Sequence, residues 1–241
     1  MTGWAFLGAG EFQDWHAEVD RALLHGRDGG VLVCATASAP EGDEVFDDWV
    51  RQGLGHYERL GVRAAAAPLK RPDDAHDDRV VSLLDETAMV FFSGGNPSYL
   101  ARVLDASPFW GRLRARLAEG SIAYAGCSAG VACLSDPTYD SDTDDFERIW
   151  VRGLGYFPNV LFGPHWDILD DWVPGSRAFI TSSTPEGGTL VAIDEGTAMV
   201  GDGAEWAVHG AGRVHIYAEG AWTDHDAGSR FAHALPTAED A

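Results

Sequence analysis

Short apolar runs alternate with amphipathic segments over the first half of the chain. The pattern predicts strands at 3–7, 31–37, 62–69, 88–92 and 121–125, and helices at 14–24, 43–60, 79–84 and 107–120. Such alternation is typical of a mostly parallel sheet with helices on both faces. Shorter strand patterns separated by turns follow at 189–193, 198–200, 206–209 and 214–217, and they predict an antiparallel C-terminal extension. We therefore expect one α/β domain over residues 1–241, with a tail that frays from about residue 235.

The segment with the clearest chemical signal is Gly126-Cys127-Ser128-Ala129-Gly130, which follows the expected strand at 121–125. A strand that turns sharply into a helix strains its corner residue, and small neighbours leave room for that conformation. A serine at such a corner projects outward, where it can act as a nucleophile. Taken alone, the motif fits an ordinary glycine-rich turn with an incidental serine about equally well.

A second glycine turn, Gly94-Gly95, follows the expected strand at 88–92. The carboxyl ends of parallel strands meet at one edge of a sheet, so this turn should lie near Ser128. An N–H from the Gly94-Gly95 turn, together with the N–H of Ala129, would then form an oxyanion hole for the negative charge that develops on a substrate.

A serine nucleophile needs a base, and the base needs an orienting acid. Of the nine histidines we favour His165, because it ends an apolar run and directly precedes Trp166. The acid should come from the six carboxylates of a polar loop between the serine and the histidine: Asp136, Asp140, Asp142, Asp144, Asp145 and Glu147. Alternate aspartates in this loop also match the start of a calcium-binding EF-hand loop, but the expected glycine and closing glutamate are missing. We therefore expect no metal.

Charge and hydropathy exclude several classes of partner. The chain has 38 acidic and 17 basic residues and a net charge of −21, so nucleic acid and anionic membranes are not expected to bind. No apolar run approaches the roughly 20 residues that span a bilayer, and the first residues do not look like a signal peptide. Three cysteines are too few for a disulfide framework, which favours a cytoplasmic location.

Five segments together make the chain resemble the serine peptidase family of dipeptidase E (aspartyl dipeptidase) and cyanophycinase. In chain order they are Gly8-Ala9-Gly10-Glu11, Phe91-Phe92-Ser93-Gly94-Gly95-Asn96, Gly126-Cys127-Ser128-Ala129-Gly130, Gly153-Leu154-Gly155-Tyr156-Phe157-Pro158 leading to Pro164-His165-Trp166, and Ala192-Ile193-Asp194-Glu195-Gly196-Thr197-Ala198. The resemblance implies a flavodoxin-like fold of the class I glutamine amidotransferase type. It also implies a Ser-His-Asp triad that acts through an acyl-enzyme without a cofactor.

The resemblance further implies which residues form the site and what they act on. Ser128 and His165 would be the nucleophile and the base, and Asp144, with Asp142 as the next candidate, would be the acid between them. We expect Asn96, Cys127 and Trp166 to contact the substrate. That substrate would be a small peptide or isopeptide cleaved next to an aspartyl residue, and a homodimer is a further hypothesis.

Two alternatives stay open at this point. The arginine-rich helix that often follows the histidine in this family is thinned here to Arg177, which favours a non-catalytic protein that binds small molecules or peptides on the same fold. The G-x-S-x-G motif also fits an esterase of the α/β-hydrolase type, with His209 or His215 as its base.

Overall fold

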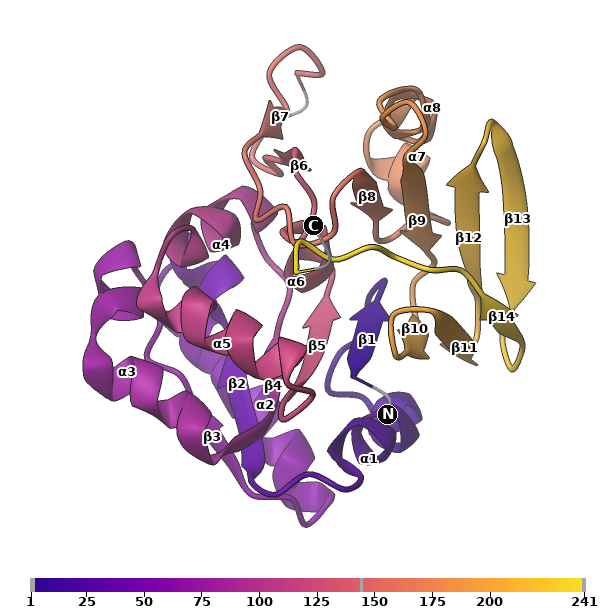
Figure 1. Ribbon diagram of the computed structural model, residues 1–241. Helices are drawn as coiled ribbons and strands as arrows, with labels where there is room; N and C mark the ends of the chain where they lie inside the picture. The colour runs from indigo at the N-terminus through magenta and orange to yellow at the C-terminus, as the bar shows by residue number, and fades with distance from the viewer. Residues whose placement is uncertain (1–2, 144, 240–241) are drawn as a thin grey trace.

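The computed structural model describes residues 3–143 and 145–239, and a large mixed sheet forms its centre (Figure 1). Five parallel strands lie in the order β1 (Trp4–Leu7), β5 (Ala123–Cys127), β4 (Thr87–Phe92), β2 (Gly30–Cys34) and β3 (Ala64–Ala66). Beyond β1 the sheet continues with three antiparallel strands, β10 (Thr197–Gly201), β11 (Glu205–Gly210) and β14 (Arg230–Ala232). This arrangement confirms the predicted α/β fold with its antiparallel C-terminal extension.

A smaller sheet stands beside the large one, in the order β13 (Ala221–Asp226), β12 (Arg213–Ala218), β9 (Thr189–Ile193) and β8 (Val160–Gly163). Within it β8 and β9 are parallel and the other pairs are antiparallel. A short hairpin of β6 (Thr138–Tyr139) and β7 (Trp150–Val151) forms a third sheet. In Figure 1 this hairpin and the helices after β8 stand on the side of the molecule to which β5 points.

Helices cover both faces of the parallel strands, as predicted. Their bounds are α1 (Ala17–Leu24), α2 (Asp43–Arg59), α3 (Asp78–Ser82), α4 (Pro97–Leu104), α5 (Pro108–Ala118), α6 (Ala129–Ala132), α7 (Leu169–Trp172) and α8 (Ser176–Ser182). Successive strand residues point to opposite faces. In β4, Phe91 therefore packs with residues of α1 and α2, whereas Phe92 packs with residues of α4 and α5.

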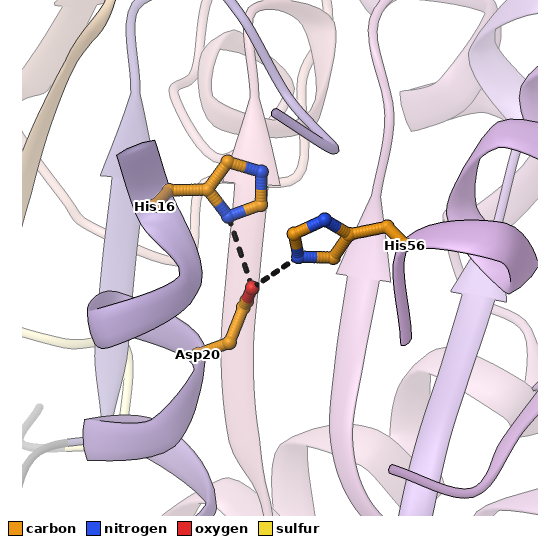
Figure 2. Close-up of side chains that lie close together, drawn as sticks. All are labelled: His16, Asp20 and His56. Carbon is orange, nitrogen blue, oxygen red and sulfur yellow. Dashed lines mark hydrogen bonds and ion pairs between the residues drawn. The ribbon is translucent and has the colours of Figure 1, made fainter. Parts of the chain in front are cut away.

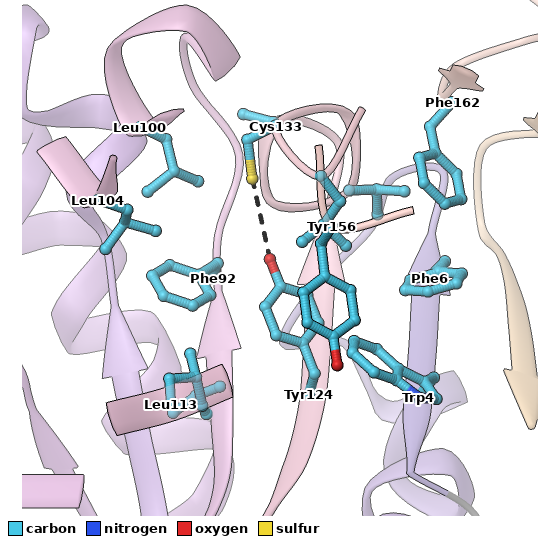
Figure 3. Close-up of a cluster of buried hydrophobic side chains, with 14 of the residues drawn as sticks. Trp4, Phe6, Phe92, Leu100, Leu104, Leu113, Tyr124, Cys133, Tyr156 and Phe162 are labelled. Carbon is cyan, nitrogen blue, oxygen red and sulfur yellow. Dashed lines mark hydrogen bonds between the residues drawn. The ribbon is translucent and has the colours of Figure 1, made fainter. Parts of the chain in front are cut away.

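The larger core cluster contains many aromatic side chains from several elements (Figure 3). Phe6 of β1 lies between Phe157 and Phe162, with ring centroids 5.7 and 5.0 Å away. Burying each large apolar side chain stabilises the fold by about 1.5–3 kcal/mol, and well-oriented aromatic pairs add to this. Phe162 belongs to β8, so these contacts fasten the small sheet to the large one.

Helix α4 and the C-terminal tail are among the parts of the chain that differ from expectation. Helix α4 was not predicted; it begins at Pro97, and the side chain of Asn96 caps it by accepting a hydrogen bond from the Tyr99 N–H at 3.0 Å. The described part of the tail, residues 235–239, is not frayed. Leu235 is buried, and the N–H of Ala238 donates to the Tyr156 carbonyl at 2.8 Å, so apolar burial and backbone pairing hold this segment. Over residues 3–143 and 145–239, every helix is too short or too polar to cross a bilayer.

Candidate active site

Ser128 occupies the sharp corner between β5 and α6. Its backbone has φ 50° and ψ −107°, a conformation that is strained for any residue other than glycine. The flanking glycines are required by close packing: a Cβ on Gly126 would lie 2.3 Å from the Gly130 carbonyl oxygen, and one on Gly130 would lie 2.3 Å from the Phe92 oxygen. The two glycines are therefore needed because the strand and helix backbones approach closely here, and the serine between them lines the adjacent pocket.

His165 lies against this serine, as the sequence predicts. Its Nε2 atom is 2.8 Å from Ser128 Oγ, although the two residues are 37 positions apart. His165 directly follows β8 and Pro164, and its φ of 56° is again in the left-handed region. Two strained residues thus face each other where the large and small sheets meet, as is common at functional sites.

Glu195 is the carboxylate that contacts the other ring nitrogen. Its Oε1 lies 2.8 Å from His165 Nδ1. Glu195 belongs to the turn between β9 and β10, and two hydrogen bonds join this turn to the histidine turn. The Glu195 N–H donates to Asp167 Oδ1 at 2.8 Å, and the Trp166 N–H donates to the Ile193 carbonyl at 3.1 Å.

The predicted acid between the serine and the histidine is therefore corrected: the carboxylate at Nδ1 comes from 30 positions after His165. Asp144 lies outside the described residues. Asp142 is exposed, and its N–H donates to Asp140 Oδ1 in its own loop. The physical reason is that β8 and β9 are parallel neighbours, so the turns at their carboxyl ends lie side by side.

The Gly94-Gly95 turn lies beside Ser128, as expected from the strand order. A Cβ on Gly94 would be 3.7 Å from the Ser128 Cβ, and one on Gly95 would be 2.4 Å from the Ala37 carbonyl carbon. The Gly94 N–H already donates to Glu11 Oε1 at 2.9 Å, which removes it from the predicted oxyanion hole. Gly95 lines the pocket at Ser128, and Ala129, as the first residue of α6, has no acceptor for its N–H within the helix.

Glu11 was not predicted as a site residue, although it belongs to the opening glycine turn. It is buried, with one oxygen at the Gly94 N–H and the other accepting from Cys127 Sγ at 2.9 Å. Burial, followed by the charge of Glu11, raises the pKa of Cys127 well above its ordinary value. The thiol therefore stays protonated and connects the serine corner to the glycine turn through Glu11.

The structure gives the three predicted substrate contacts other positions. Cys127 is buried against Glu11, and the Asn96 side chain caps α4. Trp166 packs in a separate apolar cluster with Leu161, Ile180, Leu190 and Ala192. In the described chain, none of these three side chains lines the pocket at Ser128, and their contact with a substrate stays a prediction.

That pocket is lined by Ser128 and His165 together with residues of the β6–β7 hairpin and of helices α7 and α8. Its volume is about 350 Å³, within the usual range for small-molecule sites. The walls are mostly apolar, and they are formed by Gly95, Tyr139, Ser141, Thr143, Phe146, Ile149, Trp150, Gly163, Pro164, Leu169, Trp172, Val173, Ser176, Phe179 and Ile180.

One group of side chains in the described ranges has the spacing of a metal site: His16, Asp20 and His56. Figure 2 shows both imidazoles pointing at the Asp20 carboxylate, with His16 Nδ1 at 3.0 Å and His56 Nε2 at 2.8 Å from Oδ2. The Tyr57 hydroxyl donates to the other oxygen at 3.2 Å. The carboxylate is thus already contacted by three side chains, as in a hydrogen-bond network that joins α1 to α2.

The family model of peptidase family S51 matches residues 31–208. Cyanophycinases from Synechococcus elongatus and Thermosynechococcus vestitus are each 32% identical to the chain over 97 residues, or 38% of it. That match spans only 30% of the length of these relatives.

Solved structures match over nearly the whole chain. The crystal structure of a peptidase from an acI-B1 actinobacterium has a TM-score of 0.84 at 28% identity, covering 97% of this chain and 98% of that one. A protein assigned to peptidase E from Listeria monocytogenes EGD-e has a TM-score of 0.57 at 14% identity, with coverages of 94% and 98%, and shows the fold alone.

Proposed function

Because the chain belongs to peptidase family S51, we propose that it is a serine peptidase whose triad is Ser128, His165 and Glu195. The observation that carries this proposal is the continuous chain of contacts from Ser128 Oγ to His165 Nε2, and from Nδ1 to Glu195 Oε1, at 2.8 Å each. A nucleophile, a base and an orienting acid in this order are what acyl transfer needs.

In the proposed reaction, Ser128 Oγ attacks the carbonyl carbon of the scissile bond while His165 Nε2 takes the hydroxyl proton. The N–H groups of Gly95 and Ala129 stabilise the oxyanion, and His165 then donates its proton to the leaving amine. Water then attacks the acyl-enzyme while His165 takes its proton, and His165 returns that proton to Ser128 Oγ as the ester bond breaks. Glu195 holds the imidazole with Nε2 toward the serine and stabilises its charged form.

Both alternatives lose support from this geometry. A non-catalytic binding protein was expected to have a misaligned triad, whereas the contacts here are at hydrogen-bond distance. An esterase was expected to use His209 or His215, but His165 is the histidine at Ser128, and His215 lies between Asp194 and Asp224 at 3.1 and 2.8 Å.

The expectation of an aspartyl residue beside the scissile bond comes from the family resemblance alone. The cyanophycinases match too little of this chain to transfer their substrate to it. We therefore propose a small peptide or isopeptide as the substrate. The residues that line the pocket bear on which side chain stands beside the scissile bond. The homodimer and the cytoplasmic location remain predictions.

Amine release from a mixed dipeptide and isopeptide panel tests the proposal. We expect the wild type to release amine and Ser128→Ala to lose at least about 10³-fold in kcat. The matched control is Ser141→Ala, which removes another hydroxyl from the same pocket wall and should leave kcat within a few-fold. Full activity in Ser128→Ala would refute the assignment.

A further inference from the structure

We propose that the hollow beside Ser128 is a specificity pocket for a large apolar side chain, so that the enzyme selects peptides with an aromatic or large aliphatic residue at the scissile bond, not an aspartyl residue. This inference rests on the proposed function, because the hollow is a substrate pocket only if Ser128 attacks the substrate.

Aromatic rings from two separate segments build the pocket. The hairpin segment contributes Phe146 and Trp150, and α8 contributes Phe179, which contacts both. The ring of Phe179 stacks on Phe146 with centroids 4.5 Å apart and planes 8° apart, and on Trp150 at 5.8 Å and 20°. The Trp150 Nε1–H donates to Ser183 Oγ at 3.2 Å, so its one polar atom is paired and its ring is left for apolar contact.

The remaining wall reaches the catalytic histidine. The ring centroid of Trp172, on α7, lies 4.8 Å from that of His165, and both residues line the pocket. Trp172 is 56% exposed, an unusual position for so large an apolar side chain. A substrate side chain seated beside Ser128 would cover this ring and gain the free energy of apolar burial.

Charged groups that could bind an aspartyl carboxylate are missing from the described walls. Apart from His165, the lining residues in residues 3–143 and 145–239 have no ionisable acid or base except the phenol of Tyr139. Arg177 is turned away: its guanidinium lies 5.0 Å from the Trp166 ring and lines a separate hollow with Asp194 and Asp226.

The cost of removing water favours an apolar side chain over an aspartyl carboxylate in this pocket. A carboxylate in this pocket would lose its water without gaining a cation, which is strongly unfavourable. α7 also adds negative charge beside the pocket, since Asp170 and Asp171 directly precede Trp172. An apolar side chain faces neither cost and fills the hollow.

The first test uses peptide pairs that differ at one position only, with Phe, Leu, Asp or Lys on either side of the scissile bond. We expect kcat/KM of the wild type for the best Phe or Leu peptide to exceed that of its Asp counterpart by roughly 100-fold. An Asp peptide that is cleaved as fast as or faster than its apolar counterparts would overturn the inference.

A pair of exposed tryptophans supplies a matched test of the pocket. Trp172→Arg places a cation at its wall, and we expect the Phe-to-Asp ratio of kcat/KM to fall by at least about tenfold. The control is Trp222→Arg, at a tryptophan that is 40% exposed on β13 and packs on Trp166 and Tyr217 outside the pocket; its ratio should not change. An unchanged ratio in Trp172→Arg would contradict the proposal.

Labelling with a fluorophosphonate, which reacts with an activated serine whatever the peptide preference, separates this inference from the proposed function. Labelling of the wild type but not of Ser128→Ala, combined with a preference for Asp peptides, overturns the apolar pocket and leaves the triad standing. If Ser128 is not labelled and no peptide is cleaved, both the proposed triad and the apolar pocket are overturned. If Ser128 is labelled but no peptide is cleaved, protection from labelling by Phe or Leu amides, and not by Asp amides, supports the pocket; any other protection pattern overturns it.

Discussion

At the scale of single residues, the contact between Glu195 and His165 determines which ring nitrogen faces the serine. A carboxylate at Nδ1 keeps the proton on that atom, so Nε2 has a free lone pair for the Ser128 hydroxyl. In the reaction proposed above, the same carboxylate would stabilise the imidazolium that forms when the serine attacks. Glu195 is 39% exposed, so this stabilisation depends on the direct contact and not on a dry environment.

We predict that Glu195→Gln lowers kcat by roughly 10²- to 10⁴-fold with a smaller change in KM. The amide has the same shape, but its NH₂ group can donate to Nδ1 and favour the wrong tautomer. Steady-state kinetics on the best peptide measure this loss. The controls Asp142→Asn and Asp144→Asn alter the loop in which the sequence places the acid, and they should leave kcat nearly unchanged. A loss in either control that equals the loss in Glu195→Gln would restore the acidic-loop hypothesis.

Glu11 acts on the same site from behind the glycine turn. It accepts the Gly94 N–H and the Cys127 thiol, and so fixes the turn relative to the serine corner. We predict that Glu11→Ala lowers kcat by roughly 10- to 100-fold, because small displacements of oxyanion donors are costly. Glu11→Gln keeps an acceptor for Gly94 and should lose less. Glu41→Ala, at an exposed glutamate, is the control, and equal kinetics for all three variants would exclude this role.

Sequence reasoning located two of the three proposed triad residues. The glycine-flanked motif after a strand points to Ser128, and the position after an apolar run and before Trp166 points to His165. The sequence does not single out Glu195, because the six carboxylates of the acidic loop between the serine and the histidine are the more obvious candidates. A usable signal existed: Glu195 follows the strand at 189–193, as His165 follows an apolar run, and the pairing of these two strands places both ends together. Strand pairing is a long-range property that composition and spacing do not reveal.

At the scale of elements, the corner between β5 and α6 depends on backbones that approach more closely than side chains allow. We predict that Gly130→Ala lowers the free energy of unfolding by about 1–3 kcal/mol, because its Cβ would overlap the Phe92 carbonyl. Urea denaturation measures this, and activity should fall as the corner shifts. Gly111→Ala is the control: this exposed glycine in α5 has open space around it, and alanine there should stabilise by about 0.5–1 kcal/mol. Equal effects from the two changes would exclude steric overlap as the cause.

The predicted elements were those whose residues face the core. The strands expected at 3–7, 88–92 and 121–125 and the helix expected at 43–60 follow apolar patterns set by burial, and they appear close to their expected bounds. The strands expected at 31–37 and 62–69 are shorter, at Gly30–Cys34 and Ala64–Ala66, and β14 was not predicted. The β6–β7 hairpin and helices α7 and α8 were missed. Their aromatic side chains line a pocket instead of the core, and the elements are only two to seven residues long, so they leave little periodicity.

At the scale of the whole molecule, the proposed triad is divided between two sheets. Ser128 follows β5 of the large sheet, whereas His165 and Glu195 follow β8 and β9 of the small one. Catalytic geometry therefore depends on how the sheets are fastened together, which includes the contacts of Phe162 with Phe6 and Phe157. Changes that loosen this junction should affect activity before they unfold either sheet.

The buried carboxylate of Asp20 and the side chains that contact it contribute to stability. They lie on the face of the large sheet that α1 and α2 cover, near Phe12 and Phe91. Burial disfavours the ionised form of Asp20, but hydrogen bonds and charges from His16 and His56 outweigh it, so the pKa of this carboxyl lies below its usual value. A lowered pKa in the folded state means that ionised Asp20 stabilises the fold at pH values above about 4, the unfolded pKa. This contribution is lost as the pH falls through the folded value.

We therefore predict that Asp20→Asn destabilises the protein at pH 7 by about 3–5 kcal/mol, since it leaves the two buried imidazoles without their anion. The difference from the wild type should shrink as the pH falls from about 4 through the lower pKa of the folded state, because the unfolded chain binds a proton at Asp20 first and the folded protein binds it last. Urea denaturation at pH 7, 5, 4 and 3 measures both effects. Asp14→Asn, at an exposed carboxylate in the turn before α1, is the control and should change stability by less than about 0.5 kcal/mol at pH 7. A difference that stays constant down to pH 3 would show that Asp20 stabilises the fold by its shape and hydrogen bonds, not by its charge.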